Sequence, residues 1–352
     1  MKTLLLSRRL HYVAAGIERN TSFRTQRMCL SRFHSTVADE SSLFTISPAE
    51  GSAAHVHSSL PNGIISYARG WAWQQFLLSR RLAYRRLSAE EQAEVSQQPN
   101  GAMIDADTVL LLEHEPVYTL GRGANENHLI FLQEEEHSAI REKLSRKNRG
   151  PDSARLTIDR RLLEDNLLDR PGAEAVDLLA MIASPVLAPR NVPIFRVERG
   201  GEVTFHGPGQ LVCYPMLDLQ GEPYKQDLHW FLRMVEEVVI LTLKNYGITG
   251  CRDEINTGVW VGGNKVAAVG VSSSRWISTH GFALNVCPDL SYFDTSVILP
   301  CGIDGRGVTS IAEILREQGD PVVPTVDEVA LVVLESIQNI FRIQLKIGET
   351  LR

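Results

Sequence analysis

A glycine-rich segment between two apolar segments constrains this chain more than any other part of its sequence. Residues 199–210 read RGGEVTFHGPGQ, so five of these twelve residues are glycine or proline, whereas residues 192–197 and 211–219 are mostly apolar. Glycine adopts positive φ and lets a backbone approach a ligand closely. The pattern therefore predicts a loop held between two strands, whose polar side chains face whatever the loop cradles.

Shorter motifs elsewhere predict a mixture of strands and helices. Residues 107–112 are typical of a buried strand, residues 257–271 of a β-hairpin, and residues 281–286 of another strand. Helices are expected within 67–88, between Asp227 and Gly247, and after the capping pairs Ser310/Glu313 and Thr325/Glu328. Because hairpins alternate with grouped helices, we expect an α+β fold with a mixed β-sheet core and flanking helices, in one domain over residues 63–350.

The first 38 residues differ from the rest of the chain. They carry seven Lys or Arg residues against one acid, Glu18, and residues 4–13 would give a basic amphipathic helix an apolar face. This composition is typical of a mitochondrial transit peptide and predicts a location in the mitochondrial matrix. The alternative is an unstructured basic tail. No apolar stretch approaches the roughly 20 residues that span a bilayer, so no membrane association is expected.

Two further segments are expected to lie outside the core. Residues 39–62 are rich in Ser, Ala, Pro and Gly and are predicted to form a linker. Residues 126–190 contain three consecutive glutamates and then a run of basic residues, with few aromatic residues. They are predicted to hold a variable insertion that is partly helical or disordered.

Charge and cysteine spacing exclude several classes of protein. Without residues 1–38, 29 basic residues remain against 41 acidic ones, a formal charge of −12, which argues against a nucleic-acid binder. The cysteines beyond residue 38 are Cys213, Cys251, Cys287 and Cys301, and they show no CxxC or metal-finger spacing. We therefore expect unpaired thiols in a reducing compartment, and no metal site.

Cys301 and Lys265 are candidate reactive residues. Pro300 and Gly302 fix a turn around Cys301 and leave its thiol accessible, and a nearby base or positive charge would make it a nucleophile. Lys265 follows a glycine turn and precedes small residues that leave room for a ligand. The alternatives are a turn cysteine without consequence and a solvated turn lysine.

Two histidines lie in small-residue segments. His206 either orients a neighbour or binds loop backbone, and His280 has no partner that spacing identifies. The glycine-rich segment itself fits neither the P-loop nor the dinucleotide-binding pattern. It continues into a strand rather than a helix N-terminus, which argues against nucleotide binding.

Four motifs occur in a fixed order along the chain. The longest, residues 199–215, is RGGxxTFHGPGQxxxYP, and it is followed by GNKVAAVG at 263–270, HGFALNV at 280–286, and PCG at 300–302 with VTSI at 308–311. A weaker match, EPVYTLG, lies at 115–121. Together these motifs resemble the signature of the lipoyl(octanoyl) transferases, the octanoyltransferases of lipoate biosynthesis.

The resemblance implies the fold of the biotin and lipoate protein ligase catalytic domains and a reaction that needs no cofactor. An octanoyl group would pass from octanoyl-acyl carrier protein to a lysine of the lipoyl domains of 2-oxoacid dehydrogenases and of the glycine cleavage H protein. The resemblance implies that Cys301 forms an acyl-thioester intermediate and that Lys265 lowers the pKa of its thiol or carries its proton. The implied acyl site comprises Arg199, Gly200, Gly201, Glu202, Val203, Thr204, Phe205, His206, Ala268, Val269, Gly270, Gly281, Phe282 and Ala283.

Three other functions stay open at this point. An ATP-dependent lipoate or biotin ligase of the same fold would need an adenylate site but no cysteine nucleophile. A related thiol enzyme would move octanoyl groups between lipoyl proteins, and a scaffold would bind lipoyl domains without catalysis. Because both protein partners are usually acidic, we also expect a basic patch built from Arg196, Arg199, Lys225, Arg275 and Arg306.

Overall fold

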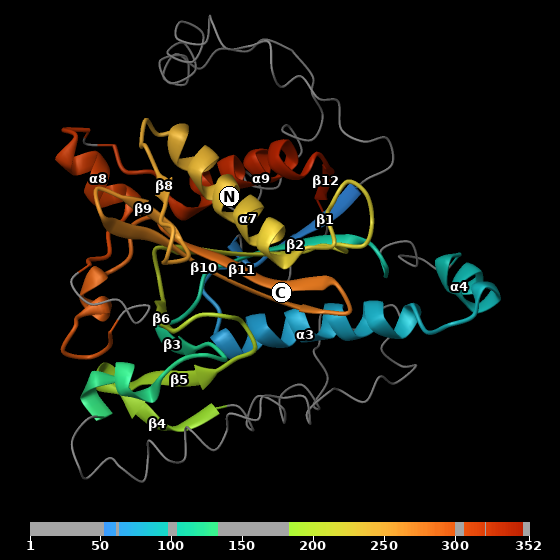
Figure 1. Ribbon diagram of the computed structural model, residues 1–352, viewed down its shortest axis with the longest axis horizontal. Helices are drawn as coiled ribbons and strands as arrows, with labels where there is room; N and C mark the ends of the chain where they lie inside the picture. The colour runs from blue at the N-terminus through green and yellow to red at the C-terminus, as the bar shows by residue number, and fades with distance from the viewer. Residues whose placement is uncertain are drawn as a thin grey trace, which may run out of the picture.

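The larger of two β-sheets forms the centre of the protein (Figure 1). A computed structural model describes residues 53–60, 63–97, 104–132, 183–299, 306–320 and 322–347. Within them, eight strands form a sheet in the order β12-β1-β2-β7-β11-β10-β9-β8. Only the pairs of β1 with β12 and with β2 are parallel, so the sheet is mixed. The strands are β1 Ala53–Ser58, β2 Asp107–Leu112, β7 Gln210–Met216, β8 Cys251–Arg252, β9 Val259–Val261, β10 Asn264–Ser274, β11 Ile277–Asn285 and β12 Gln344–Ile347.

A smaller sheet of four strands lies below the first in Figure 1, in the order β4-β5-β3-β6. β3 is parallel to β5 and antiparallel to β6. Its strands are β3 Val117–Leu120, β4 Ala183–Ala188, β5 Val192–Arg196 and β6 Val203–His206. The turn after β6 leads directly into β7, so residues 203–216 connect the two sheets.

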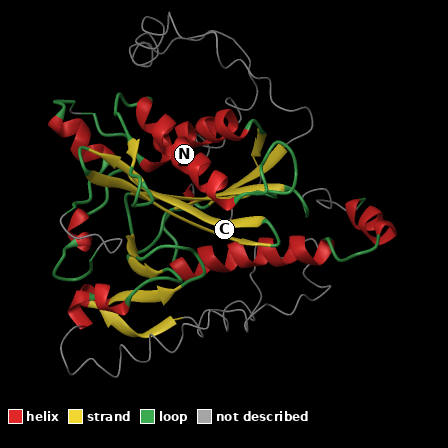
Figure 2. Cartoon of the chain, in the orientation of Figure 1, coloured by secondary structure: helices red, strands yellow, loops and turns green. Residues whose placement is uncertain are grey.

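Helices cover both faces of the larger sheet (Figure 2). α7 and α9 pack on one face, where their apolar residues share a hydrophobic core with the strands, and α3 packs on the other face. The helices are α3 Tyr67–Tyr84, α4 Ala89–Ser96, α7 Leu228–Lys244, α8 Ile311–Glu317 and α9 Val326–Phe341, with short 3-10 turns at Glu126–His128, Ile130–Leu132, Pro189–Asn191 and Leu290–Phe293. No helix in the described part of the chain is long and apolar enough to cross a membrane. The expected α+β fold with a mixed sheet is confirmed.

The predicted helix after Asp227 is confirmed as α7. The Asp227 carboxylate caps its first turn by accepting hydrogen bonds from the main-chain N–H of His229 at 2.8 Å and of Trp230 at 3.2 Å. Phe231 and Val235, one turn apart, have no exposed surface and begin the face that packs on the sheet. Burying each such side chain stabilises the fold by about 1.5–3 kcal/mol.

The two predicted capping pairs also open helices. The Ser310 hydroxyl accepts a hydrogen bond from Glu313 N at 3.2 Å at the start of α8. At the start of α9, Thr325 and Glu328 form a complete capping box, in which each side chain accepts from the other residue's main-chain N–H. The predicted hairpin over 257–271 is confirmed as β9 and β10.

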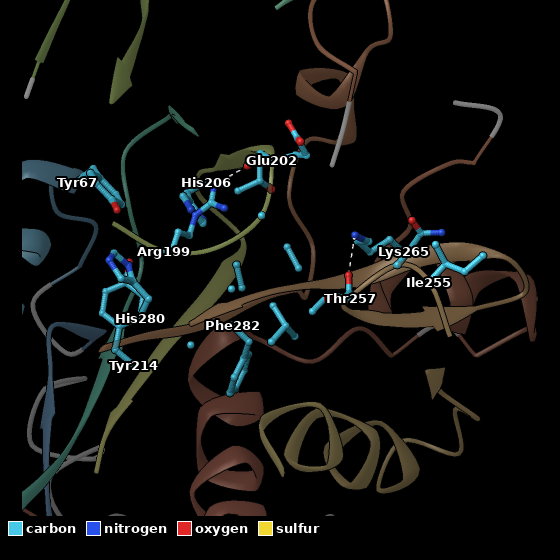
Figure 3. A pocket seen from close by; sticks show the side chains of 18 residues that line it. Tyr67, Arg199, Glu202, His206, Tyr214, Ile255, Thr257, Lys265, His280 and Phe282 are labelled. Carbon is cyan, nitrogen blue, oxygen red and sulfur yellow. Dashed lines mark hydrogen bonds between the residues drawn. The ribbon is translucent and has the colours of Figure 1, made fainter. Parts of the chain in front are cut away.

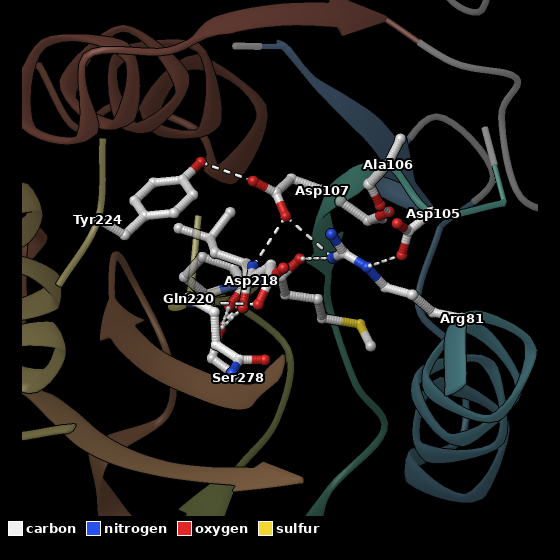
Figure 4. A network of polar contacts seen from close by, with 12 residues as sticks. Arg81, Asp105, Ala106, Asp107, Asp218, Gln220, Tyr224 and Ser278 are labelled. Atoms are coloured by element: carbon white, nitrogen blue, oxygen red, sulfur yellow. Dashed lines mark hydrogen bonds and ion pairs between the residues drawn. The ribbon is translucent and has the colours of Figure 1, made fainter. Parts of the chain in front are cut away.

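A partly buried polar network links the C-terminal half of α3 to the larger sheet (Figure 4). The Arg81 guanidinium is paired with Asp105 at 3.0 Å and with Asp107 at 2.9 Å, and Arg85 is paired with Asp218 at 2.7 Å. Burial raises the pKa of Asp218, but the hydrogen bond and charge of Arg85 hold it below its usual value. The network sets the position of α3, whose first residue is Tyr67.

The predicted linker over residues 39–62 is wrong in its second half. Ala53–Ser58 form β1, which is paired on both sides, so the domain includes residue 53 rather than beginning at 63. A Ser- and Ala-rich composition is also compatible with a short strand when distant segments of the chain supply its partners. Residues 1–38, predicted to be a transit peptide, and residues 39–52 lie outside the described residues.

Two other boundaries need correction. The ends of the predicted 126–190 insertion belong to the fold, because Leu129 and Leu132 are buried and Ala183–Ala188 form β4. Residues 133–182 lie outside the described residues. The predicted glycine-rich loop is also interrupted, since Val203–His206 form β6. The β-branched residues Val203 and Thr204, followed by the aromatic Phe205, favour that strand over a continuous loop.

Candidate functional site

A pocket of about 190 Å³ is lined by residues of both sheets (Figure 3). Its volume lies below the roughly 300–1,000 Å³ of pockets for drug-sized ligands, which favours a narrow ligand. The predicted acyl-site residues that line it are Arg199, Gly201, Glu202, Thr204, His206, Ala268, Val269, Gly270, Gly281, Phe282 and Ala283, and Lys265 also lines it. Segments far apart in the sequence therefore meet here.

A groove of small residues runs along one face of the β10–β11 pair. Ala268 is opposite Ala283, and Gly270 is opposite Gly281, in the antiparallel register. Residues two apart on a strand face the same side, so these two pairs lie side by side on one face. The small side chains of Ala268 and Ala283 and the absence of a side chain at Gly270 leave a slot suited to a linear apolar chain. Gly281 is required for a different reason, because a Cβ there would lie 2.2 Å from Cys213 O of β7.

Three predicted acyl-site residues do not line the pocket. Val203 and Phe205 alternate with Thr204 and His206 along β6, so their side chains face the opposite side. The Phe205 ring stacks there on the ring of Tyr292, with 4.4 Å between the ring centroids. Gly200 stabilises the wall of the pocket through its main chain, because its N–H donates to the carbonyl oxygen of Val271 in β10 at 3.1 Å.

Arg199 acts as an internal clamp for the turn that carries it. Its Nη2 donates to the main-chain oxygen and to the Oγ1 of Thr119, each at 2.8 Å, and to Glu202 O at 3.0 Å. Glycine is required where other segments approach this turn. A Cβ on Gly121 would lie 2.1 Å from Gly201 O, and one on Gly270 would lie 3.0 Å from Gly200 O. The turn is therefore fixed from several sides.

Lys265 lies at the opposite end of the pocket from His280 and Tyr214 (Figure 3). Its side chain is 6% exposed, and Nζ donates to Thr257 O at 3.0 Å. The same nitrogen lies 4.7 Å from the ring centroid of Trp260, a distance suited to a cation–π interaction. Gly258 leaves room for the lysine, because a Cβ there would lie 3.2 Å from its Cε. The solvated turn lysine considered above is therefore excluded.

Cys301 lies outside the described residues, with its neighbours 300–305. The residues that follow this segment are described and run beside Lys265. Lys265 N donates to Gly307 O at 3.0 Å, and Thr309 N donates to Lys265 O at 3.0 Å. On the other side of the segment, Leu299 N donates to His128 O at 2.7 Å.

His206 is neutral and bonded through both ring nitrogens. Burial lowers its pKa well below the usual value, and the charges of His114 and Arg199 lower it further. Nδ1 lies 2.8 Å from Gln210 Oε1, and Nε2 lies 3.2 Å from Thr119 Oγ1. This geometry supports a role in orienting neighbours rather than in moving protons.

His280 has a partner that spacing could not reveal. Its Nε2 lies 3.3 Å from Glu198 Oε2, and its φ of 58° is in the left-handed region. Glu198 Oε2 also accepts from Trp71 Nε1 at 3.1 Å. Burial raises the pKa of Glu198, but the hydrogen bond and charge of His280 and the bond from Trp71 hold it below its usual value.

The remaining pocket residues were missed by the sequence analysis. Tyr67 comes from α3 and stacks on His206, with ring centroids 5.9 Å apart. Tyr214 lies inside the longest motif but received no role, although a motif tyrosine was a usable signal. The loop residues Ile255, Asn256 and Thr257 had no sequence signal.

The predicted basic patch is wrong for two of its members. Arg196 pairs with Glu126 and its side chain is 8% exposed, and Arg199 is buried in the clamp described above. Arg306 pairs with Asp253 and lies 4.9 Å from the Trp260 ring centroid. Arg196 and Arg199 therefore add no charge to the exposed surface, whereas the Arg306 side chain is 41% exposed.

Acid is expected to destabilise the fold through His114, which packs against Tyr67 and His206. Burial lowers the pKa of His114 to about 4, although the Ile65 carbonyl raises it slightly. The unfolded state therefore binds a proton near pH 6.5, whereas the folded state does so only near pH 4. Stability is full above pH 6.5 and falls by about 3 kcal/mol as the pH drops to 4.

Urea unfolding at a series of pH values between 7 and 4.5 measures this dependence. His114→Phe should flatten the curve partly, because His206 shifts in the same direction and continues to contribute. An identical slope in the wild-type protein and in His114→Phe contradicts the assignment.

The described site combines a narrow apolar slot, a buried primary amine and a fixed turn. Among the described residues, no group of three His, Cys, Asp or Glu side chains is arranged to hold a metal ion. The amine is the group with the potential to carry a proton or to stabilise an anion beside the slot. The arrangement therefore suits transfer of a linear apolar group at a carbonyl carbon.

Comparison with known proteins gives consistent matches. The family described as the lipoyl protein ligase A/B catalytic domain matches residues 177–338. An octanoyltransferase of Gloeobacter violaceus is 37% identical over 265 residues, which are 74% of this chain and 84% of that protein. One of Synechococcus elongatus is 41% identical over 251 residues, 71% of this chain and 75% of that protein. A chloroplastic octanoyltransferase of Arabidopsis thaliana is 34% identical over 257 residues, which are 72% of this chain and 65% of that protein. A solved structure of lipoate-protein ligase A bound with ATP matches with a TM-score of 0.46 and 14% identity, over 86% of this chain and 90% of that one.

Proposed function

This chain belongs to the octanoyltransferase family, with the lipoyl protein ligase A/B catalytic domain that its motifs predicted, and from that membership we propose how its pocket works. It is an acyltransferase that transfers octanoyl groups in lipoate biosynthesis. The proposed donor is octanoyl-acyl carrier protein. The proposed acceptors are the lipoyl domains of 2-oxoacid dehydrogenases and of the glycine cleavage H protein.

In the first proposed step, Cys301 becomes acylated. Its thiol gives a proton to the neutral form of the Lys265 amine, and its sulfur attacks the thioester carbonyl of the donor. A new sulfur–carbon bond forms as the carrier's carbon–sulfur bond breaks. The carrier thiolate leaves and takes the proton from Lys265. Because the donor is already a thioester, this step requires no ATP.

In the second proposed step, the acceptor lysine attacks the acyl-enzyme. Its amine nitrogen forms an amide bond with the octanoyl carbonyl carbon, and the bond to Cys301 breaks. The proton released by the amine passes to Lys265 and then to the sulfur of Cys301. The same lysine thus serves as base and acid in both steps.

The observation that carries this proposal is the small-residue groove in a pocket that Lys265 also lines. The pairs Ala268/Ala283 and Gly270/Gly281 leave a slot for an acyl chain, and Lys265 lies beside the residues that follow Cys301 in the chain. This arrangement supports placing the carbonyl of the octanoyl group near the amine. Transfer from a thioester requires a thiol nucleophile and a base, which Cys301 and Lys265 would supply. This pair favours transfer from a thioester over the ligase reaction, which needs no thiol nucleophile.

A comparison of three donors tests the proposal. An unmodified lipoyl domain is mixed with the protein and with octanoyl-carrier protein, or octanoate with Mg-ATP, or an octanoylated lipoyl protein. Intact mass should show one octanoyl group on the lipoyl domain with the first donor alone. Modification only with octanoate and Mg-ATP indicates a ligase, and modification only with the third donor indicates transfer between lipoyl proteins.

We also propose that residues 1–38 direct the chain to mitochondria. The excess of basic residues and the potential for an amphipathic helix support this assignment. The Arabidopsis relative carries a chloroplastic name, so the two organelles must be distinguished. Fluorescence microscopy of residues 1–38 fused to a fluorescent protein makes that distinction, and plastid fluorescence would overturn the mitochondrial assignment.

A further inference from the structure

Two buried amide side chains in the larger sheet have no role in the function proposed so far. Gln210 begins β7 and Asn285 ends β11, and they are directly opposite each other in the strand register. They are 1% and 3% exposed. Each also belongs to one of the motifs, Gln210 to that of residues 199–215 and Asn285 to that of residues 280–286. Buried amides are costly unless hydrogen-bonded, and an apolar pair would fill the same place at lower cost.

The orientation of Gln210 is fixed by its partners. Its Nε2 donates to the main-chain oxygen of Phe205 at 3.2 Å, and a carbonyl oxygen only accepts. Its Oε1 must therefore accept the bond of 2.8 Å from Nδ1–H of His206. His206 then carries its proton on Nδ1, and its Nε2 accepts from the Thr119 hydroxyl at 3.2 Å. The Thr119 oxygen in turn accepts from Arg199 at 2.8 Å.

The orientation of Asn285 is fixed in the same way. Its Nδ2 donates to Thr309 O at 2.9 Å, so its Oδ1 accepts from Nε2 of Gln210 at 2.9 Å. Thr309 N donates to Lys265 O at 3.0 Å. A single chain of directed hydrogen bonds thus runs from the turn at Arg199, through the core, to the main chain beside Lys265.

We propose that Gln210 and Asn285 are positioning residues for octanoyl transfer. They hold residues 307–309 beside Lys265 and tie them to the turn that lines the acyl pocket. In doing so they fix the position of residues 307–309, which follow Cys301 in the sequence, relative to Lys265. The expected effect on catalysis rests on the proposed function. The expected effect on the main chain rests on the observed hydrogen bonds alone.

Asn285→Leu tests the proposal, because leucine has nearly the same shape but neither donates nor accepts. We expect kcat for acyl transfer to fall about 10- to 100-fold, since a small displacement of reacting groups costs that much, while KM for octanoyl-carrier protein changes by less than about 2-fold. Hydrogen–deuterium exchange should be faster at Lys265 N–H and Thr309 N–H, which bond to Gly307 O and Lys265 O.

Asn245→Leu is the matched control. Asn245 also donates from Nδ2 to a main-chain oxygen, that of Leu241 at 3.0 Å, but it lies at the C-terminal end of α7. We expect this variant to keep the wild-type kcat and the wild-type exchange at Lys265 and Thr309. A similar loss of kcat in both variants would show a general loss of stability and overturn the positioning role.

Asn285→Asp provides a second variant if the leucine variant does not fold. A carboxylic acid donates to Thr309 O only when it is protonated. Its kcat relative to wild type should therefore rise as the pH falls, whereas a role in packing alone gives a constant ratio. A constant ratio, or unchanged exchange at Thr309, overturns the proposal. If wild-type protein forms no acyl adduct, the proposed function fails, and the exchange data still decide whether Asn285 holds this segment.

Discussion

Cys301→Ser should form no acyl adduct and should lose octanoyl transfer by about 10³-fold or more, as expected for removal of a nucleophile. Wild-type protein mixed with octanoyl-carrier protein gains the mass of one octanoyl group in the proposed mechanism. Serine has nearly the same size, but its hydroxyl is far less acidic than a thiol, so the same base does not activate it. Intact mass measured before the acceptor is added isolates this first step.

The other cysteines supply controls for that experiment. Cys213 is fully buried, and burial raises the pKa of its thiol. Partial burial and the charge of Glu113 raise the pKa of the Cys287 thiol. Neither Cys251 nor Cys287 lines the pocket, so Cys251→Ser and Cys287→Ser should acylate like the wild-type protein. An adduct that persists in Cys301→Ser and disappears in one of these variants would move the nucleophile to the other cysteine.

Lys265→Met should lower kcat for transfer by about 10²- to 10⁴-fold, the usual effect of removing a general acid–base group. Methionine fills similar space but carries no proton and no charge. The midpoint of the pH profile for alkylation of Cys301 should also move up toward about 8.5, the pKa of a free thiol. Iodoacetamide labelling, followed by peptide mass spectrometry, reports Cys301 separately from the other thiols.

Lys244→Met is the control for charge, since Lys244 is exposed at the C-terminal end of α7 and does not line the pocket. It should keep both the wild-type kcat and the alkylation profile. If Lys265→Met lowers kcat without moving the profile, Lys265 acts on the acceptor amine and not on the thiol. If neither quantity changes, Lys265 has no part in the chemistry.

Local patterns allowed much of the fold to be predicted. The Asp227 cap and the apolar period after it define α7, and Gly262-Gly263 define the β9–β10 turn, because these signals act within a few residues. The small residues Ala268, Gly270, Gly281 and Ala283, which their motifs placed in the acyl site, all line the pocket. The motif could not show that Thr204 and His206 line the pocket whereas Val203 and Phe205 do not. The direction of each side chain depends on β6 being a strand.

The rest depends on contacts between distant parts of the chain. Glu198 and His280 are adjacent because β11 passes the start of the glycine-rich segment, and Tyr67 reaches the pocket because α3 packs against strands of both sheets. β1 was missed for the same reason, because its partners β2 and β12 come much later in the chain. Periodicity carries no information on such pairings.

The parallel pairing of β1 with β12 also bears on the biogenesis of this protein. Ala53 is matched with Gln344, so the first described strand is completed on one side by the last. Until β12 has been synthesised, β1 would present unpaired main-chain groups at a sheet edge, which is a template for wrong pairing. Strand pairings of such long range form slowly, because the entropy cost of closing the loop comes before the pairing stabilises the fold. Pairing of β1 with β12 therefore waits until all the other described strands have been synthesised.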